Sequence, residues 1–214
     1  MHPADCPSWE YTNNPLNNQV LYQRTALIIR DLRSAVADTL RLSVDSRPFH
    51  GFLFEQLTPD ACDYYAGHYR GEPYRCLRFY PVGIRSDPRV GAHPNSVLDL
   101  MQQLADNISR GIIQLDYLAL NSPFELLKRV VRFTCAVFEL FLRIHPYVNG
   151  NGHIGRLIVL GILGRFGFWL KRWQIHPRPT NFPYVELIRE YRDGNKEPLE
   201  SFILRMILGD TGNI

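Results

Sequence analysis

A turn of seven residues rich in glycine and asparagine, residues 146–152, separates the two best-marked helical patterns of this 214-residue chain. The first helix is expected to begin at residues 122–125, where serine is the cap, proline the first helical residue and glutamate completes a capping box. It keeps a broad apolar face up to Ile144, and the pair of His145 and a proline is expected to stop it, because a residue before proline disfavours the α conformation. A second apolar helix is expected over residues 153–168. Two buried helices joined by a tight turn therefore dominate the expected fold.

The rest of the chain is also mainly helical in pattern. Helices are expected at residues 20–42 and 47–57, from Thr58 or Pro59 to about residue 66, and again from about Pro94. Between residues 74 and 93, β-prone residues are interrupted by repeated prolines and glycines, which indicates a hairpin or a loop. The expected fold class is all-α, with at most a short hairpin.

Composition fits one ordinary domain. Hydrophobic residues make up 45% and charged residues 21% of the chain, as is typical of globular proteins. We expect an irregular N-terminal extension at residues 1–19 and a single domain at residues 20–214. The longest apolar run, residues 157–164, is too short to span a bilayer, and the polar start lacks signal-peptide features. These observations predict a cytoplasmic protein without a membrane partner, and delivery elsewhere as an effector stays open.

The four cysteines show no metal-binding or redox spacing. Cys6, Cys62, Cys76 and Cys135 are separated by 56, 14 and 59 residues. The sequence therefore predicts four ordinary thiols in a reducing compartment.

Positive charge is concentrated in one part of the chain. Residues 128–178 contain nine lysines and arginines against one acid, Glu139, which gives +8, whereas the remainder carries 15 cations and 20 acids, which gives −5. An excess of this size favours an anionic ligand such as a nucleotide, a nucleic acid or an acidic surface. The alternative is that these side chains only solvate the outer faces of two apolar helices.

Residues 150–155 match the letters G-x-G-x-x-G but not the context of a dinucleotide-binding motif, because a helix precedes them and no acidic residue lies between Glu139 and Glu186. A glycine turn before a helix still presents backbone N–H groups and a positive dipole end, which together bind anions such as phosphate. Arg156 lies on the same face of the first turn as His153 and can reach a bound phosphate. His145, across the turn, suits a general base that activates a hydroxyl for attack on phosphorus. The alternative is an ordinary turn with a capping histidine.

Two other kinds of site are disfavoured. Arg165, Lys171 and Arg172 are spread along the chain without an aromatic stacking array, which argues against nucleic-acid binding. His145 and His153 do not have zinc-ligand spacing, and no glutamate lies between them.

The segment from His145 to Arg156, HPYVNGNGHIGR, resembles the signature of Fic domains, His-Pro-Phe-x-Asp/Glu-Gly-Asn-Gly-Arg-x-x-Arg. Residues 66–70 (AGHYR) resemble the Ala-Gly-x-x-Arg element before the flap of that family. The stretch of residues 77–94, from Leu77 to Pro94, occupies the place of the flap hairpin. Residues 193–202 resemble the last helical stretch. The resemblance covers about residues 45–205.

The resemblance implies a Fic-type helical bundle with a β-hairpin flap. It also implies transfer of a nucleoside monophosphate, usually AMP from ATP, to a Ser, Thr or Tyr hydroxyl of a target protein. His145 would be the catalytic base, and the flap would bind a strand of the target. The implied nucleotide- and phosphate-binding residues are Gly150, Asn151, Gly152, His153, Gly155, Arg156 and Tyr184, with Tyr191 as a further candidate for the base pocket.

Two positions depart from the signature. Asn149 replaces the acid that holds Mg²⁺ or Mn²⁺ and would bind the metal weakly, and His153 replaces the first arginine. One change removes a negative charge and the other a positive one, so we expect a compensated pair that shifts the preferred donor or relaxes the metal requirement. The alternatives are transfer of UMP, a phosphoryl group or phosphocholine, and a site degraded to a nucleotide- or protein-binding module. The chain contains no self-inhibitory Ser/Thr-x-x-x-Glu-Gly/Asn string, so Arg156 is not expected to be blocked in cis, and the protein is either unrestrained or held by a separate inhibitor protein.

Overall fold

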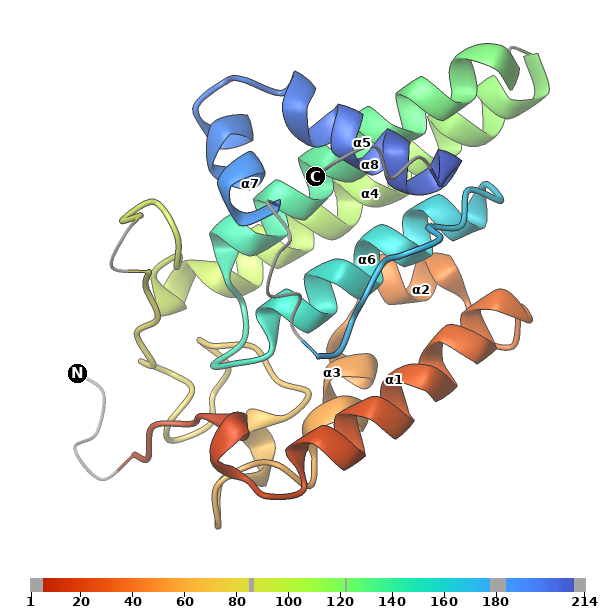
Figure 1. The fold of residues 1–214 in the computed structure, drawn as a ribbon. Helices are drawn as coiled ribbons and strands as arrows, with labels where there is room; N and C mark the ends of the chain where they lie inside the picture. Colours follow the sequence, from red (N-terminus) through yellow and green to blue (C-terminus); the bar gives the residue numbers. More distant parts are fainter. Residues whose placement is uncertain (1–5, 85–86, 122, 178–183, 210–214) are drawn as a thin grey trace.

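Helices make up most of the structure (Figure 1). The computed structural model describes residues 6–84, 87–121, 123–177 and 184–209. In these ranges the backbone forms eight α-helices and two 3-10 helices, which confirms the all-α fold class. The α-helices are α1 (Asn17–Arg33), α2 (Thr39–Val44), α3 (Arg47–Phe54), α4 (Pro94–Asn121), α5 (Pro123–Ile144), α6 (Asn151–Arg165), α7 (Tyr184–Arg192) and α8 (Glu197–Leu208), and the 3-10 helices are η1 (Tyr11–Asn13) and η2 (Asp63–Tyr65). No helix of the described part is long and apolar enough to cross a membrane.

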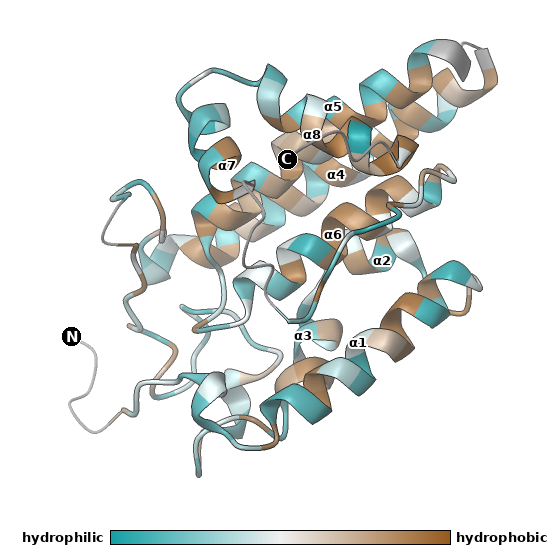
Figure 2. Cartoon of the chain, viewed as in Figure 1, coloured by the Kyte–Doolittle hydropathy of each residue, from teal (hydrophilic) through white to brown (hydrophobic). Residues whose placement is uncertain are grey.

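Helix α6 lies at the centre of the fold and is buried at every position from His153 to Leu163. It packs against α5, α2 and α1, and α5 in turn packs against α4, α7 and α8. Figure 2 shows many apolar residues along α4, α5 and α6. A helix that is apolar all round is stable only inside a core, because each of its faces must be removed from water.

The central pair of helices and the turn between them are confirmed. Helix α5 ends at Ile144, as the proline after His145 predicts. Helix α6 begins at Asn151, two residues before the expected start, and ends at Arg165. His145 itself has a φ of +54°, so the chain turns out of the helix at this residue and not after it.

The prediction of one helix over residues 20–42 was wrong. Helix α1 ends at Arg33, and Ala35 has a φ of +57°, which ends the helical backbone. A new helix, α2, begins after Asp38, whose carboxylate accepts hydrogen bonds from the backbone N–H groups of Leu40 and Arg41 at 2.8 and 3.3 Å. Asp38 is a good N-cap residue, but the apolar residues keep a helical spacing on both sides of it, and this spacing led to the prediction of a single helix.

The expected helix from Thr58 to about residue 66 is also absent from the structure, which has only the short η2 there. Ala61 has a φ of +60°, which breaks the helical path. The chain then passes close to α3. The approach is so tight that a Cβ on Gly67 would lie 3.3 Å from the Cα of Gly51, which leaves little room for a side chain. Helix α3 ends at Phe54, three residues before the expected end.

The segment of residues 77–94 is a loop wherever the structure describes it, except that its last residue, Pro94, begins α4. Its sole β-contact among the described residues is an isolated antiparallel bridge between Ile84 and Asp87. The hairpin implied by the family resemblance is therefore not confirmed. The loop is held at the end of α5, where the N–H groups of Gly91 and Ala92 donate to the carbonyls of Arg143 and Ile144 at 2.9 and 3.1 Å.

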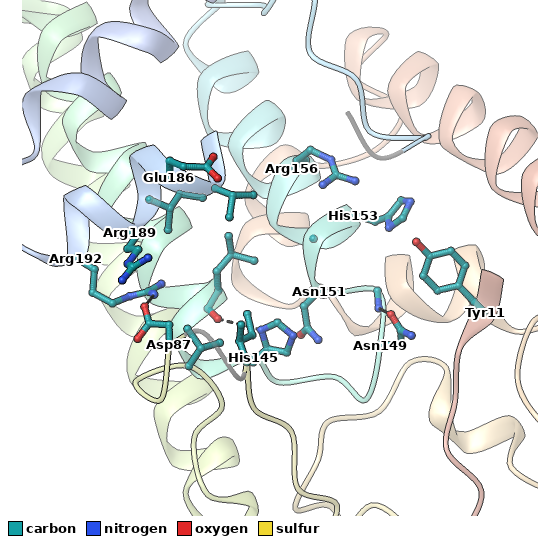
Figure 3. Close-up of a pocket in the computed structure, with 17 residues that line it drawn as sticks. Tyr11, Asp87, His145, Asn149, Asn151, His153, Arg156, Glu186, Arg189 and Arg192 are labelled. Atoms are coloured by element: carbon teal, nitrogen blue, oxygen red, sulfur yellow. Dashed lines mark hydrogen bonds and ion pairs between the residues drawn. The ribbon is translucent and has the colours of Figure 1, made fainter. Parts of the chain in front are cut away.

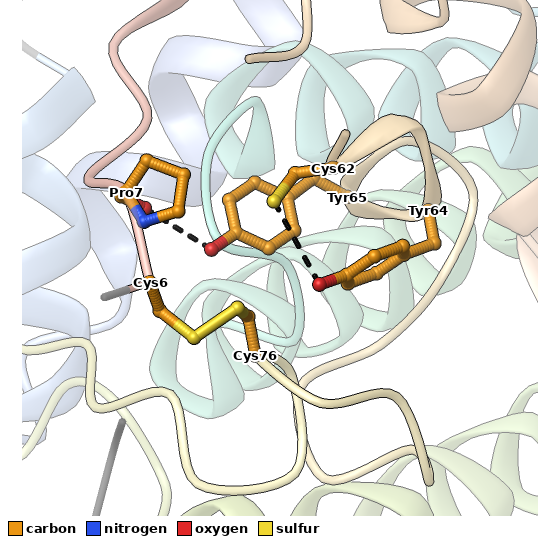
Figure 4. Close-up of a disulfide and its surroundings, with 6 residues drawn as sticks. All are labelled: Cys6, Pro7, Cys62, Tyr64, Tyr65 and Cys76. Atoms are coloured by element: carbon orange, nitrogen blue, oxygen red, sulfur yellow. Dashed lines mark hydrogen bonds between the residues drawn. A yellow bond between two sulfur atoms is a disulfide. The ribbon is translucent and has the colours of Figure 1, made fainter. Parts of the chain in front are cut away.

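The prediction of four free thiols was wrong for two of them. Cys6 and Cys76, 70 residues apart, form a disulfide (Figure 4). Cys62 and Cys135 are free and buried. Because disulfides persist mainly in oxidising environments, the cysteines give no support to a reducing compartment. A separation of 70 residues carries no pairing signal that sequence reasoning could use.

The disulfide fixes one end of what we call the N-terminal strap, residues 6–13, which has no α-helix. Trp9 in the middle of the strap is only 3% exposed, and its indole N–H donates to the carbonyl of Leu57 at 2.7 Å. The Tyr65 hydroxyl donates to the carbonyl of Pro7 at 3.0 Å. Trp9 therefore anchors the strap in the core, and Tyr11 near its end packs against His153 at the start of α6.

Candidate active site

A cavity of about 560 Å³ lies where segments far apart in the sequence meet (Figure 3). The strap, the loop of residues 77–94, the end of α5, the first turns of α6, and α7 all contribute to its wall. The lining residues are Tyr11, Ile84, Asp87, Val90, Leu142, His145, Asn149, Gly150, Asn151, Gly152, His153, Arg156, Val185, Glu186, Ile188, Arg189 and Arg192. The structure thus brings together seven of the residues that the sequence predicts.

Three other predicted residues are not part of this wall as described. Gly155 packs against α5, since a Cβ there would lie 2.8 Å from the ring of Phe138. Tyr191 is buried, and the Lys196 ammonium lies 5.7 Å from its ring centroid. The side chain of Tyr184 lies outside the described residues, so its predicted role stays a prediction.

His145 projects into the cavity with one ring nitrogen already engaged. Its Nδ1 lies 3.1 Å from the carbonyl oxygen of Leu142. Because a carbonyl can only accept, Nδ1 carries the proton and Nε2 keeps its lone pair. Burial, together with the positive charges of Arg70 and Arg192, lowers the pKa of His145 to about 4. The imidazole is therefore neutral at pH 7, as a general base has to be.

Arg70 holds the end of α5 in place. Its side chain is fully buried, and it donates only to backbone carbonyls: those of Tyr80, Ala92, Ile144 and, twice, His145. Its own N–H donates to the carbonyl of Pro146 at 2.8 Å. Burial lowers the pKa of Arg70 to about 10, so the guanidinium stays charged and neutralises the negative end of the helix dipole.

The turn between the helices is shaped by Gly150 and by a buried histidine. Gly150 has a φ of +79°, and a Cβ on it would lie 2.5 Å from the ring of Phe54. His50 accepts from the N–H of Gly67 at Nδ1, so its Nε2 carries the proton and donates to the carbonyl of Asn149 at 3.0 Å. Burial lowers the pKa of His50 to about 3. This histidine is a neutral structural link between the turn and α3.

The side chain of Asn151 is used inside the turn. Its Oδ1 accepts from the N–H of Tyr147 at 2.9 Å, and its Nδ2 donates to the carbonyl of the same residue at 2.8 Å. An anion at the start of α6 would therefore meet backbone groups. The N–H groups of Asn151 and Gly152 come before that of His153, which donates to the carbonyl of Gly150 at 3.0 Å, and they lie at the positive end of the helix dipole.

Arg156 adds a formal positive charge beside these amides. The residue is 2% exposed, and its guanidinium donates to the carbonyl of Ile175 at 2.6 Å. A Cβ on Gly152 would lie 3.2 Å from the Nη1 of Arg156, so the guanidinium lies over the first turn of α6. Both groups line the cavity. The first turn of α6 and Arg156 together form a positively charged wall, which we call the anion-binding wall after the ligand that its chemistry favours.

His153, the second departure from the signature, contacts residues outside α6. Its Nε2 lies 3.2 Å from Nδ1 of His176, and Nε2 of His176 lies 3.2 Å from Oδ1 of Asn18. Its ring is met edge-on by the rings of Tyr11 and Phe54, with centroids 5.5 and 5.6 Å away. His153 thus connects α6 with the strap and with the segment after α6.

Asn149, the first departure, also contacts the strap. Its Nδ2 donates to the carbonyl of Trp9 at 2.9 Å and to the carboxylate of Glu10 at 3.1 Å, while its Oδ1 accepts from the N–H of Gly150 at 2.7 Å. Among the described residues no three His, Cys, Asp or Glu side chains converge to hold a metal ion. Asn149 is the residue that would contribute to holding the metal, and the binding of Mg²⁺ or Mn²⁺ together with a nucleotide stays a prediction.

Ion pairs hold the loop of residues 77–94 against the helices. Asp87 pairs with Arg192 of α7 at 2.6 Å, and Arg192 also donates to Glu139 of α5 at 2.7 Å. Hydrogen bonds from Arg89 and Arg192 keep the pKa of Asp87 well below its usual range. This side of the cavity is therefore fixed by charges from three separate segments.

Sequence reasoning missed Tyr11, Asp87, Arg189 and Arg192 as lining residues. They lie in the strap, the loop and α7, and no spacing relates them to the residues of the turn. Arg189 is exposed and makes no ion pair among the described residues. Comparison of the chain with protein-family models and with curated proteins finds no match.

Proposed function

We propose that this protein is a Fic-type nucleotidyltransferase that moves a nucleoside monophosphate, with AMP from ATP as the first candidate, to a Ser, Thr or Tyr hydroxyl of a target protein. The observation that carries the proposal is the meeting of a neutral His145 and the anion-binding wall of α6 in one cavity. Its volume of about 560 Å³ lies in the range of small-molecule sites.

The phosphates of the donor would bind the first turn of α6 and Arg156. Nε2 of His145 would take the proton of the target hydroxyl as its oxygen attacks the α-phosphorus. The bond from the α-phosphorus to the bridging oxygen then breaks, and pyrophosphate leaves with its charge neutralised by the same wall. The chain's own residues thus supply base, orientation and charge.

The low pKa of His145 fits this role once the donor is bound. A base with a pKa of about 4 is weak, but the negative charges of a triphosphate raise the pKa of a nearby imidazole toward neutrality. Base strength would therefore be greatest in the complex that reacts. In the absence of donor the imidazole stays neutral and ready to accept a proton.

The partners follow from the same proposal. The loop of residues 77–94 borders the cavity with Ile84, Asp87 and Val90, and would contact the segment of the target that carries the hydroxyl. Three expectations from the sequence belong to the proposal: a cytoplasmic location of the protein, no nucleic-acid partner, and an activity that is either unrestrained or held by a separate inhibitor protein.

The proposal is tested by incubating the protein and a cell lysate with each of four α-labelled nucleoside triphosphates. Protein-bound label that is lost with His145→Ala supports a transferase, and the best donor identifies the transferred group. Tyr117→Ala is the matched control, because Tyr117 is 70% exposed on α4 and lies outside both the cavity wall and the loop of residues 77–94. Nucleotide binding without label from any donor would instead support the binding module.

A further inference from the structure

The N-terminal strap contributes a side chain to the proposed donor site. Tyr11 is the strap residue that lines the cavity. Figure 3 shows it across the cavity from His145, with its hydroxyl end toward His153 and the first turn of α6. The family signature contains nothing from this part of the chain, so the contact is not one that the resemblance implies.

The position of Tyr11 is fixed by the strap on its N-terminal side. The disulfide to Cys76 and the buried Trp9 hold the strap at two points. Trp9 packs among His50, Phe54 and Tyr65, with ring centroids 5.7 to 6.0 Å apart. A side chain that is held in this way loses little conformational freedom when a ligand binds.

The ring of Tyr11 is also fixed from the cavity side. It packs against Phe54 with centroids 5.3 Å apart and meets His153 edge-on at 5.5 Å. Phe54 is fully buried and is itself in contact with the turn at Gly150. The hydroxyl therefore lies on the same wall as the backbone groups that bind anions.

Both departures from the Fic signature contact this strap. Asn149 donates to the carbonyl of Trp9 and to Glu10, and His153 packs against Tyr11. A carboxylate at position 149 could not donate these hydrogen bonds, and its charge would lie close to that of Glu10. The asparagine at position 149 and the histidine at position 153 thus both make contacts with the strap that the residues of the Fic signature would not make in the same way.

We infer that Tyr11 binds the phosphate chain of the nucleotide donor, with its hydroxyl as a hydrogen-bond donor to a phosphate oxygen. The inference rests on the proposed function and adds to it a residue that determines the affinity for the donor. Phosphate oxygens are strong acceptors, and a tyrosine hydroxyl on a wall that already carries helix amides and Arg156 complements them. Asn149 would act as a positioning residue, because it holds the strap that carries Tyr11.

The test is calorimetric binding of ATP and of adenosine to the wild-type protein and to Tyr11→Phe, with Tyr117→Phe as the matched control. Tyr117 lies on α4, is 70% exposed and is not part of the cavity wall. Tyr11→Phe keeps the ring contacts, so folding is preserved. We expect it to weaken ATP binding about tenfold, the effect of one hydrogen bond to a charged oxygen, and to leave adenosine binding unchanged.

The other outcomes overturn the inference in distinguishable ways. If the wild type binds ATP and Tyr11→Phe binds it equally well, Tyr11 is no donor contact and the proposed function still stands. If ATP and adenosine binding weaken together, the contact is with the nucleoside and the phosphate assignment is wrong. If the wild type binds neither ligand, the proposed function fails and the inference fails with it.

Discussion

The guanidinium of Arg70 donates two hydrogen bonds to the carbonyl of His145, from Nε at 2.9 Å and from Nη2 at 2.7 Å. The same side chain donates to the carbonyls of Tyr80 and Ala92, which lie near the two ends of the loop of residues 77–94 that borders the cavity. One buried cation therefore sets the backbone of the candidate base and the position of that loop together.

Replacement of Arg70 by lysine is expected to unfold the protein more easily and to impair the site. Lysine has one ammonium in place of a planar fork, so several buried carbonyls lose their donor. We expect the free energy of unfolding to fall by about 3 kcal/mol, as for two or more unsatisfied buried acceptors. Denaturant unfolding measures this, with the exposed Arg172→Lys as the control. An equal loss in both variants would contradict the role of Arg70.

Gly150→Ala is expected to be much more costly than Gly167→Ala. Both glycines have a φ of +79°, but a Cβ at Gly150 would lie 2.5 Å from Phe54, whereas nothing lies within 4 Å of a Cβ at Gly167. The control should lose about 1 kcal/mol from the left-handed backbone alone, and Gly150→Ala about 3 kcal/mol or more, because its ring contact adds overpacking. Thermal unfolding of the pair separates the two effects. Similar losses would show that the turn can move away from Phe54.

Stability is expected to fall as the pH drops from about 6.5 to about 4. Over this range an unfolded histidine with a pKa of 6.5 binds a proton, whereas folded His145, with a pKa of about 4, does not. The unfolded state then binds more protons, so acid favours unfolding by up to about 1.4 kcal/mol per pH unit for each such histidine. The slope of unfolding free energy against pH should be shallower in His145→Asn than in the wild type. An unchanged slope would contradict the low pKa of His145.

The disulfide is expected to be visible in a thiol titration. The unfolded, unreduced protein should show two thiols, those of Cys62 and Cys135, and four after reduction. Because the bridge closes a 70-residue separation, its reduction should lower the free energy of unfolding by about 4 kcal/mol in the chain-entropy account. The double variant Cys6→Ser, Cys76→Ser should no longer respond to the reductant. Four thiols before reduction would disprove the bridge.

Asn149→Asp is expected to loosen the strap. The new carboxylate loses the hydrogen bond to the carbonyl of Trp9 and lies beside Glu10, so we expect a loss of about 1–2 kcal/mol in unfolding free energy. Glu10→Gln in the same background should restore part of this loss, because it removes the like charge. The double-mutant cycle measures the coupling. Additive effects would mean that residues 149 and 10 do not interact.

Much of the fold could be predicted because its signals are local. The helices on either side of the turn follow from a proline and an apolar period within residues 123–165, whereas the expected cap at residue 122 lies outside the described residues. The break after Arg33 was missed because apolar residues continue at helical spacing through it, although Asp38 marked a new cap. Local backbone geometry at Ala35 and Ala61 has no comparable sequence signal.

The site was predictable only where it is continuous in the sequence. His145 and Arg156 lie eleven positions apart in one motif, and both line the cavity. Tyr11 and Arg192 reach the same cavity from opposite ends of the chain, through contacts that only the folded core creates. The contacts of Asn149 and His153 with the strap could not be predicted from the sequence either, since their partners in the strap are about 140 residues away.

The most direct test of the central claim compares ATP labelled at the α-phosphate with ATP labelled at the γ-phosphate. With a lysate as the source of target and a lysate without the protein as the blank, the account predicts protein-bound label above the blank from the α-phosphate alone. This label should be absent in His145→Ala and complete in Tyr117→Ala. Label from the γ-phosphate alone would mean phosphoryl transfer. Labelling that persists in His145→Ala would contradict the assignment of His145 as the base.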